Sequence, residues 1–227
     1  MTDHFVVMNI TPLLADETLY SRAAETLPSE RWERIERIRP ARERCLSLGG
    51  SLLLIDVLLE YGIAAPSFGY GENGKPYLPD FPRLHFNISH AGEYAICAVS
   101  DNPVGCDIEK MRPYRQQLAE RVLSAEELSQ FATEKDKSSR DTLFFRFWTL
   151  KESFLKAVGC GITVQLPSVS FNLTGKEPVV TQQITGERYS FYEYDAFPGY
   201  RCALCKKDGG AFPPLTIKKI NEQGVMI

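Results

Sequence analysis

Hydrophobic and polar residues alternate over short stretches of this chain, and an alternation with a period of two predicts half-buried β-strands. The stretches expected to form strands are residues 5–10, 84–90, 94–99, 104–109, 168–173, 189–194 and 200–205. Turn-forming residues stand between several of them, including an Asn-Gly pair at residues 73–74 that is typical of a hairpin. We therefore expect many short strands joined by tight turns.

Helical periodicity predicts a long helix that starts near residue 139 and that Gly159 is placed to end. A capping box at residues 124–127 predicts a shorter helix before it. Pro40 predicts a break between two earlier helices, and the second of these is hydrophobic almost all round, so we expect it to be buried. The long helix has one apolar stripe, formed by Leu143, Phe147, Leu150, Phe154 and Val158.

Two carboxylates lie on one face of the predicted strand at residues 104–109. Asp107 and Glu109 are two positions apart, so both side chains leave the same face, while Cys106 and Ile108 point the other way into a core. Such a pair offers hard oxygen ligands to a metal ion.

A third carboxylate and a lysine come from the long helix. Glu152 and Lys156 are four residues apart and share a face opposite the apolar stripe. An exposed salt bridge would explain this pair, but Trp148, one turn earlier on the same face, argues against a purely solvated surface. Three carboxylates beside a lysine suit Mg²⁺ and a phosphate group, because Mg²⁺ prefers oxygen ligands and leaves positions for phosphoryl oxygens.

Composition limits the partners of the protein. The 227 residues have a formal net charge of −3 and a sequence pI of about 5.7, which gives no overall attraction to nucleic acid or acidic membranes. The six cysteines lie among apolar residues, as in reduced cytosolic proteins, and Cys202 and Cys205 have no second cysteine pair with which to hold zinc. No basic signal-peptide region or membrane-length apolar run is present, so we expect a soluble, cytoplasmic protein.

The chain contains a faint internal similarity. In both residues 93–101 and residues 199–208, an aromatic residue is followed by small residues and then by a polar turn. This predicts two similar halves, residues 1–103 and 104–227, with Asp107 where they meet. Ligand sites often lie in clefts between halves, so we expect the active site there. His90 ends a predicted strand shortly before the acidic strand, which places it as a candidate for the same cleft.

Four sequence blocks, in this order and at these separations, resemble the signature of Sfp-type 4′-phosphopantetheinyl transferases. The blocks are Gly74-Lys75-Pro76, Asn87-Ile88-Ser89-His90, Gly105-Cys106-Asp107-Ile108-Glu109, and the segment from Phe147 to Lys156. The resemblance implies an α+β fold of two similar halves related by a pseudo-twofold axis, each with a small, mainly antiparallel sheet packed with helices. It also implies transfer of the phosphopantetheine arm of coenzyme A to a serine of an acyl or peptidyl carrier protein, with release of 3′,5′-ADP.

The resemblance also assigns residues. It implies that Mg²⁺, or Mn²⁺ in its place, binds Asp107, Glu109 and Glu152, and that Lys156 contacts the coenzyme A diphosphate. Asp107, Glu152 and Lys156 are then the catalytic residues. Further coenzyme A contacts are implied for Lys75, Ser89, His90 and Arg44, and for Arg31 and Arg34 where some relatives have lysines.

Several points stay open at this stage. Arg42 is an alternative to Arg44 at the 3′-phosphate, and the six arginines between residues 31 and 44 alternate with glutamates as on an ordinary solvated helix. The base that activates the serine is either Glu152 or a Mg²⁺-bound water. The competing functions are a coenzyme A or carrier-binding module without turnover and a Mg²⁺-dependent phosphodiesterase. The identity of the carrier protein is not encoded in these motifs, and we expect a monomer.

Overall fold

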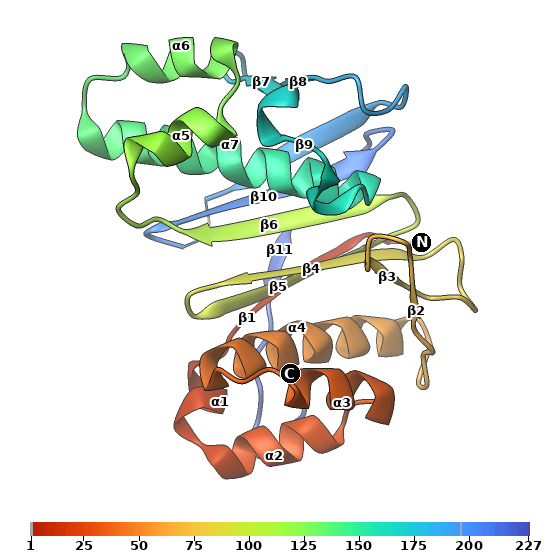
Figure 1. Ribbon diagram of the computed structural model, residues 1–227. Coiled ribbons are helices and arrows are strands. Elements are labelled where there is room, and N and C mark those ends of the chain that lie inside the picture. Colours follow the sequence, from red (N-terminus) through yellow and green to blue (C-terminus); the bar gives the residue numbers. More distant parts are fainter. Residues whose placement is uncertain (1, 196) are drawn as a thin grey trace. The chain divides into compact units, whose positions relative to one another are not determined.

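The computed structural model describes residues 2–195 and 197–227 (Figure 1). The contacts between residues divide the chain into two compact units. The first unit combines Met1–Gly69, Pro76–Asp101 and Pro213–Ile227, and the second combines Tyr70–Lys75 and Asn102–Phe212. The predicted halves met at residue 103. In the structure the last fifteen residues join the first unit, because a short strand within them pairs with the first strand of the chain.

The first unit is a four-stranded sheet with one helix against it (Figure 1). The strand order is β11-β1-β5-β4. Strand β1 (His4–Asn9) is antiparallel to β5 (Tyr94–Ser100), and β5 is antiparallel to β4 (His85–Ala91). Strand β11 (Leu215–Ile217) is parallel to β1. Helix α4 (Ala41–Glu60) packs against β1, β4 and β5, and its burial confirms the prediction that it is apolar almost all round and buried.

Two glycines bring α4 close to the sheet. A Cβ atom on Gly50 would lie 2.4 Å from a methyl group of Ile88, and one on Gly49 would lie 2.7 Å from Ile10. Three short helices, α1 (Thr11–Ala15), α2 (Glu17–Glu25) and α3 (Ser29–Glu36), contact α4 as well. The predicted break at Pro40 is confirmed, because α3 ends before it and α4 begins directly after it.

A hairpin formed by β2 (Gly69–Tyr70) and β3 (Pro76–Tyr77) contains the predicted Asn-Gly turn. The amide of Gly74 donates to the carbonyl of Gly71 over 2.8 Å, and Gly74 has a φ of +76°. Glycine adopts this left-handed conformation at little cost, which is the reason for its place in the turn.

The second unit is a three-stranded antiparallel sheet covered by the longest helix (Figure 1). The central strand β10 (Tyr200–Lys207) pairs with β6 (Val104–Lys110) on one side and β9 (Tyr189–Tyr194) on the other. Helix α7 (Lys137–Val158) packs on this sheet and ends where predicted, with Gly159 at a φ of +80°. A core of phenylalanine side chains from α7 and β9 holds the helix on the sheet.

Short elements complete the second unit. Helix α5 (Gln116–Val122) precedes α6 (Ala125–Thr133), whose N-terminus carries the predicted capping box of Ser124 and Glu127. The 3₁₀ turns η1 (Gly161–Thr163) and η2 (Leu166–Ser168) follow α7, and strands β7 (Ser170–Asn172) and β8 (Val179–Thr181) form a separate hairpin. The mixture of helices with small, mainly antiparallel sheets confirms the α+β class.

The burial of α7 differs from the prediction of a single apolar stripe. Leu143 and Val158 are only partly buried, whereas Lys151 is fully buried. The Lys151 ammonium lies 2.6 Å from the Glu127 carboxylate and donates to the carbonyls of Leu166 and Val169. This buried pair joins α6, α7 and the segment before β7, so a second face of α7 is packed.

Two further expectations concern the environment of the chain. All six cysteines are free thiols, and five of them are buried, which agrees with their interpretation as core residues. Within residues 2–195 and 197–227, every helix is too short or too polar to span a membrane.

Candidate functional site

Strand β6 presents two carboxylates on the face that packs against α7. Asp107 is buried, with only 3% of its surface exposed, and Glu109 is partly buried toward the end of the strand. Opposite them on β10 lie Ala203 and Arg201. Cys106 and Ile108, which point to the other face of the strand, are buried as expected, and Asp107 is buried as well.

Gly105 allows α7 to pack directly against β6. A Cβ atom at this position would lie 2.1 Å from the carbonyl oxygen of Ser153, 2.3 Å from the amide nitrogen of Ala157 and 2.9 Å from the carbonyl carbon of Lys156. Real Cβ atoms do not approach other atoms so closely, and all three neighbours are backbone atoms. The close approach of strand and helix therefore depends on the absence of a side chain at Gly105.

This close packing brings the helix residues next to the strand carboxylates. The ammonium of Lys156 lies 2.5 Å from Oδ1 of Asp107 and 3.4 Å from the carbonyl oxygen of Cys106. Glu152 lies one helical turn earlier, partly buried. Its carboxylate is close enough to Asp107 and Lys156 for both to influence its pKa. The structure thus gathers Asp107, Glu109, Glu152 and Lys156 in one cluster.

The electrostatics of the cluster are those of crowded carboxylates in a partly buried place. Burial, and then the negative charge of Asp107, raise the pKa of Glu109 to about 7. The same two causes raise the pKa of Glu152. Burial lowers the pKa of Lys156, but the charge and hydrogen bond of Asp107 outweigh it and leave that pKa raised. Lys156 alone therefore compensates only part of the negative charge.

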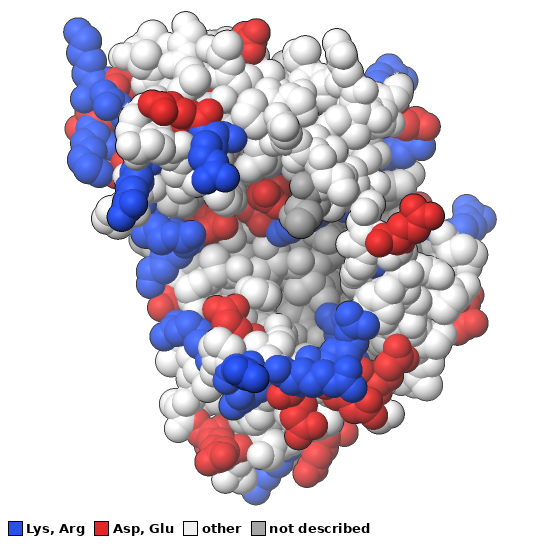
Figure 2. Space-filling view, in the orientation of Figure 1, with Lys and Arg blue, Asp and Glu red and all other residues white. Residues whose placement is uncertain are grey.

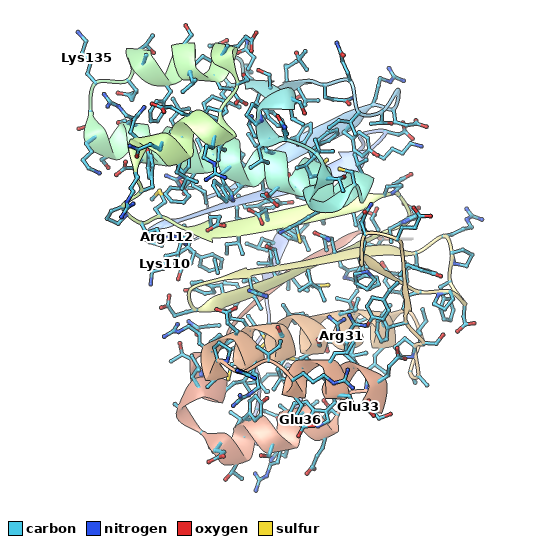
Figure 3. All side chains as sticks on the ribbon, viewed as in Figure 1. Arg31, Glu33, Glu36, Lys110, Arg112 and Lys135 are labelled. Atoms are coloured by element: carbon cyan, nitrogen blue, oxygen red, sulfur yellow. The ribbon has the colours of Figure 1, made fainter. Side chains whose placement is uncertain are left out.

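The donor set fits a divalent cation. Asp107, Glu109 and Glu152 supply hard oxygen atoms, and the charge of Asp107 raises the pKa of both glutamates, an excess of negative charge that a cation such as Mg²⁺ would relieve. As the described residues are placed, however, no group of three His, Cys, Asp or Glu side chains is arranged so that it could hold a metal ion. Asp107 is paired with Lys156, and Glu109 is 3.5 Å from Arg112, which Figure 3 labels just beyond the end of β6.

The predicted arginines lie in the first unit. Arg31 on α3, labelled in Figure 3, donates from Nε to the hydroxyl of Ser51 over 2.9 Å and lies over the ring of Phe68. Arg34 on the same helix is exposed. Arg44 donates to the carbonyls of Ile38 and Arg39, which tie its side chain to the loop before α4.

The remaining predicted contacts come from two other segments. Ser89 and His90 lie near the end of β4 in the first unit, where Ser89 is buried and His90 is partly buried. Arg42, the alternative to Arg44, donates to the carbonyl of Gly92 over 3.0 Å. Lys75 belongs to the second unit, and its ammonium contacts backbone carbonyls at the end of α7.

Charge on the surface is mixed. Over the helices of the first unit, Figure 2 shows Lys and Arg interspersed with Asp and Glu on the face in view. This distribution matches the low formal net charge of −3. The face in view therefore carries charges of both signs.

Sequence reasoning missed three structural features around α7. Gly105 stood in a quoted motif, but its contact with α7 was not foreseen. Lys151 was adjacent to Glu152 in another motif, and its burial with Glu127 was not expected. The side chain of Lys75 was expected at a ligand and is engaged with the protein backbone.

Comparison with known proteins gives matches along most of the chain. Residues 103–205 match the 4′-phosphopantetheinyl transferase superfamily, and residues 15–102 match the N-terminal part of a 4′-phosphopantetheinyl transferase. A 4′-phosphopantetheinyl transferase of Bacillus subtilis is 35% identical over 198 residues, which are 86% of this chain and 87% of the relative.

Two other relatives carry the same name. The 4′-phosphopantetheinyl transferase Sfp of Bacillus subtilis strain 168 is 39% identical over 140 residues, covering 61% of this chain and 62% of the relative. The 4′-phosphopantetheinyl transferase gsp of Aneurinibacillus migulanus is 31% identical over 194 residues, covering 84% and 80%. The chain therefore belongs to the 4′-phosphopantetheinyl transferase family, among its Sfp-type members.

Proposed function

We propose that this protein transfers the 4′-phosphopantetheine arm of coenzyme A to a serine hydroxyl of an apo acyl or peptidyl carrier protein and releases 3′,5′-ADP. The observation that carries the proposal is the cluster of Asp107, Glu109, Glu152 and Lys156 on β6 and α7, in a chain of this family. The cluster offers negative oxygen ligands and one cation at a single place, as transfer from a diphosphate requires.

Asp107, Glu109 and Glu152 would hold the Mg²⁺ ion. When bound, Mg²⁺ supplies positive charge that stabilises the developing charge on the diphosphate oxygens of coenzyme A. The raised pKa values of Glu109 and Glu152 support this assignment, because carboxylates that repel one another gain the most from a shared cation.

Lys156 provides the protein's own positive charge at the diphosphate. Asp107 holds its ammonium at 2.5 Å, and 29% of the Lys156 side chain remains exposed, so the fixed charge stays within reach of a diphosphate oxygen. An ammonium fixed before the substrate arrives needs no reorganisation during the reaction, which is the condition for efficient electrostatic stabilisation.

Glu152 is the candidate acceptor of the serine proton. In the reaction the serine oxygen forms a bond to the β-phosphorus of coenzyme A, and the bond from that phosphorus to the bridging oxygen of 3′,5′-ADP breaks. The serine proton moves to the Glu152 carboxylate or to a water molecule. Burial and the charge of Asp107 raise the pKa of Glu152, and a base is most effective when its pKa lies near the working pH.

The nucleotide end of coenzyme A is assigned to the first unit. Arg31, Arg34 and Arg44 supply positive charge for the 3′-phosphate, and Ser89 and His90 supply polar contacts at the end of β4. A charge-assisted contact of this kind is worth about 1.5–3 kcal/mol. Loss of the residue at the 3′-phosphate should therefore weaken coenzyme A roughly ten- to a hundredfold more than dephospho-coenzyme A.

The test is the intact mass of apo-carrier proteins incubated with the protein, coenzyme A and Mg²⁺. The carrier should gain one phosphopantetheine group, and a carrier whose serine is replaced by alanine should gain none. Unchanged mass for acyl and peptidyl carriers, with coenzyme A bound but intact, would favour a binding module. Consumption of coenzyme A in the absence of carrier would favour a phosphodiesterase.

A further inference from the structure

The turn before β3 lies on the C-terminal end of α7. The ammonium of Lys75 contacts three backbone carbonyl oxygens: it is 2.5 Å from that of Lys156, 3.2 Å from that of Ala157 and 3.4 Å from that of Val104. Two of these carbonyls belong to the last turn of α7, and the third belongs to the start of β6. One side chain thus joins the two elements that form the carboxylate cluster.

Asn73 reinforces the same contact. Its side-chain amide donates to the carbonyl oxygen of Gly159 over 3.1 Å. A Cβ atom on Gly159 would lie 3.4 Å from Cδ of Lys75, and one on Gly161 would lie 3.1 Å from Cβ of Asn73. The side chains of the turn thus pack directly against the glycines that follow α7, and a side chain on Gly161 would crowd Asn73.

These contacts provide hydrogen-bond partners for carbonyl groups at the end of α7. The last carbonyl groups of a helix have no partner within the helix, and positive charge near them is favourable because of the helix dipole. Basic residues that serve this purpose commonly come from the last turn itself. Here the cation comes from a turn about eighty residues earlier in the chain, so the cap also fixes that turn to the helix.

The place of Lys75 is costly for a lysine. Its contacts with the protein are with neutral carbonyl groups, and burial lowers its pKa to about 8. An exposed lysine would avoid this desolvation. The ammonium of Lys75 is therefore partly withdrawn from water at the end of α7.

Lys156 transmits the effect of the cap to the cluster. The carbonyl oxygen of Lys156 accepts from Lys75, while the ammonium of the same residue pairs with Asp107. Loss of the cap frees the last turn of α7, and that turn carries Lys156. Glu152, one turn earlier, is affected less.

We propose that Lys75, together with Asn73, caps α7 and is a positioning residue that holds Lys156 beside Asp107, in place of the coenzyme A contact expected from the sequence. The effect on catalysis rests on the proposed transferase function. The cap itself does not, because it is a property of the folded second unit.

The kinetic test compares Lys75→Met with Lys176→Met, which removes an exposed lysine of the same unit. Misplacement by about 1 Å costs up to roughly a hundredfold in rate. Lys75→Met should therefore lower kcat about 10- to 100-fold, with KM for coenzyme A changed less than about threefold. Lys75→Arg should recover part of the loss, and Asn73→Ala should give a smaller loss in kcat. Lys176→Met should leave both constants unchanged.

A binding role for Lys75 predicts the opposite split. If the ammonium contacts coenzyme A, Lys75→Met should raise KM and the calorimetric Kd for coenzyme A while kcat per folded molecule is retained. That result would overturn the proposal. Equal kcat and KM in Lys75→Met and the native protein, after correction for the folded fraction, would overturn it as well.

A measurement without turnover separates this proposal from the proposed function. The amide of Gly159 donates to the carbonyl of Leu155 in the capped helix end, so its hydrogen exchange reports opening of the last turn. Exchange at this amide should become faster in Lys75→Met and Asn73→Ala and stay unchanged in Lys176→Met. Faster exchange in a protein that shows no transfer would support the cap and contradict the transferase function. Unchanged exchange would contradict the cap, and Asn73→Ala provides this test if Lys75→Met does not fold.

Discussion

Replacing Gly105 with alanine should separate β6 from α7. The new Cβ atom would lie 2.1 Å from the carbonyl oxygen of Ser153, and ordinary contact begins at 3.4 Å, so the strand and the helix must move apart by about 1.3 Å at this point. The neighbouring atoms belong to the backbone of α7 and are unable to rotate away as a side chain would.

The expected loss follows from this displacement. Overpacking a core by one methyl group typically costs about 1–3 kcal/mol, and a rigid backbone neighbour places Gly105→Ala at the upper end, about 3 kcal/mol. For a protein of this size that lowers Tm by roughly 6–12 °C. A shift near 1 Å also moves Lys156 and Glu152 relative to Asp107, so the rate per folded molecule should fall by up to about a hundredfold.

Urea unfolding and steady-state carrier labelling measure the two effects. Gly186→Ala is the matched control, because a Cβ atom there meets no atom within 4 Å and its backbone is not left-handed. This control should change stability by less than about 1 kcal/mol and leave activity unchanged. If Gly105→Ala matched the control in both measurements, the contact between β6 and α7 would not be what forms the cluster.

Three other changes test separate parts of the site. Lys151→Met leaves the buried carboxylate of Glu127 without its cation and should lower the free energy of unfolding by about 3–5 kcal/mol. The double variant Lys151→Met with Glu127→Leu should lower it by less, because no buried charge is left unpaired. Urea unfolding of the two variants measures the difference. Glu152→Gln should bind coenzyme A nearly normally and lower turnover by about 10²–10⁴ if Glu152 is the base, and turnover recovered by excess Mg²⁺ would leave it as a ligand only. The pKa of Glu109 is raised from 4.5 to about 7, so in the metal-free protein the folded state favours the protonated carboxyl. This contribution to stability is complete below about pH 4.5 and is lost as the pH rises through 7. Mg²⁺ needs the carboxylate, so its calorimetric affinity should rise with pH by up to about tenfold per unit below pH 7 and then level off, and Glu109→Gln should flatten the profile.

Local signals predicted the parts of the fold that depend on neighbouring residues. The period of two placed β6 and put Asp107 and Glu109 on one face, and Gly159 marked the end of α7. The capping box of Ser124 needs only the three residues that follow it. Such features are encoded within a few positions, so the sequence alone is enough to find them.

Features that depend on distant segments were not predictable in this way. Strand β11 has three residues, and its partner β1 lies some two hundred positions earlier. The helical wheel gave no reason to bury Lys151, because the carboxylate that pairs with it comes from Glu127 on a different helix. The side chain of Lys75 bonds to carbonyl groups, which no residue pattern marks.

The candidate site likewise has parts that local sequence predicts and parts that depend on distant segments. Strand and helix periodicity grouped Asp107 with Glu109 and Glu152 with Lys156, but each pair by itself is common. The meeting of the two pairs depends on Gly105, whose missing side chain allows the contact between β6 and α7. Sequence periodicity describes each element separately and does not contain this contact.

The central claim is that the carboxylate cluster catalyses Mg²⁺-dependent transfer of phosphopantetheine, and the intact mass of an apo-carrier tests it most directly. With coenzyme A, the native protein should add one phosphopantetheine group only when Mg²⁺ is present. Asp107→Asn should do so more slowly and should need more Mg²⁺, because Asp107 both serves as a ligand and holds Lys156 at 2.5 Å. A carrier labelled equally fast by the native protein and by Asp107→Asn, at every Mg²⁺ concentration, would contradict the claim.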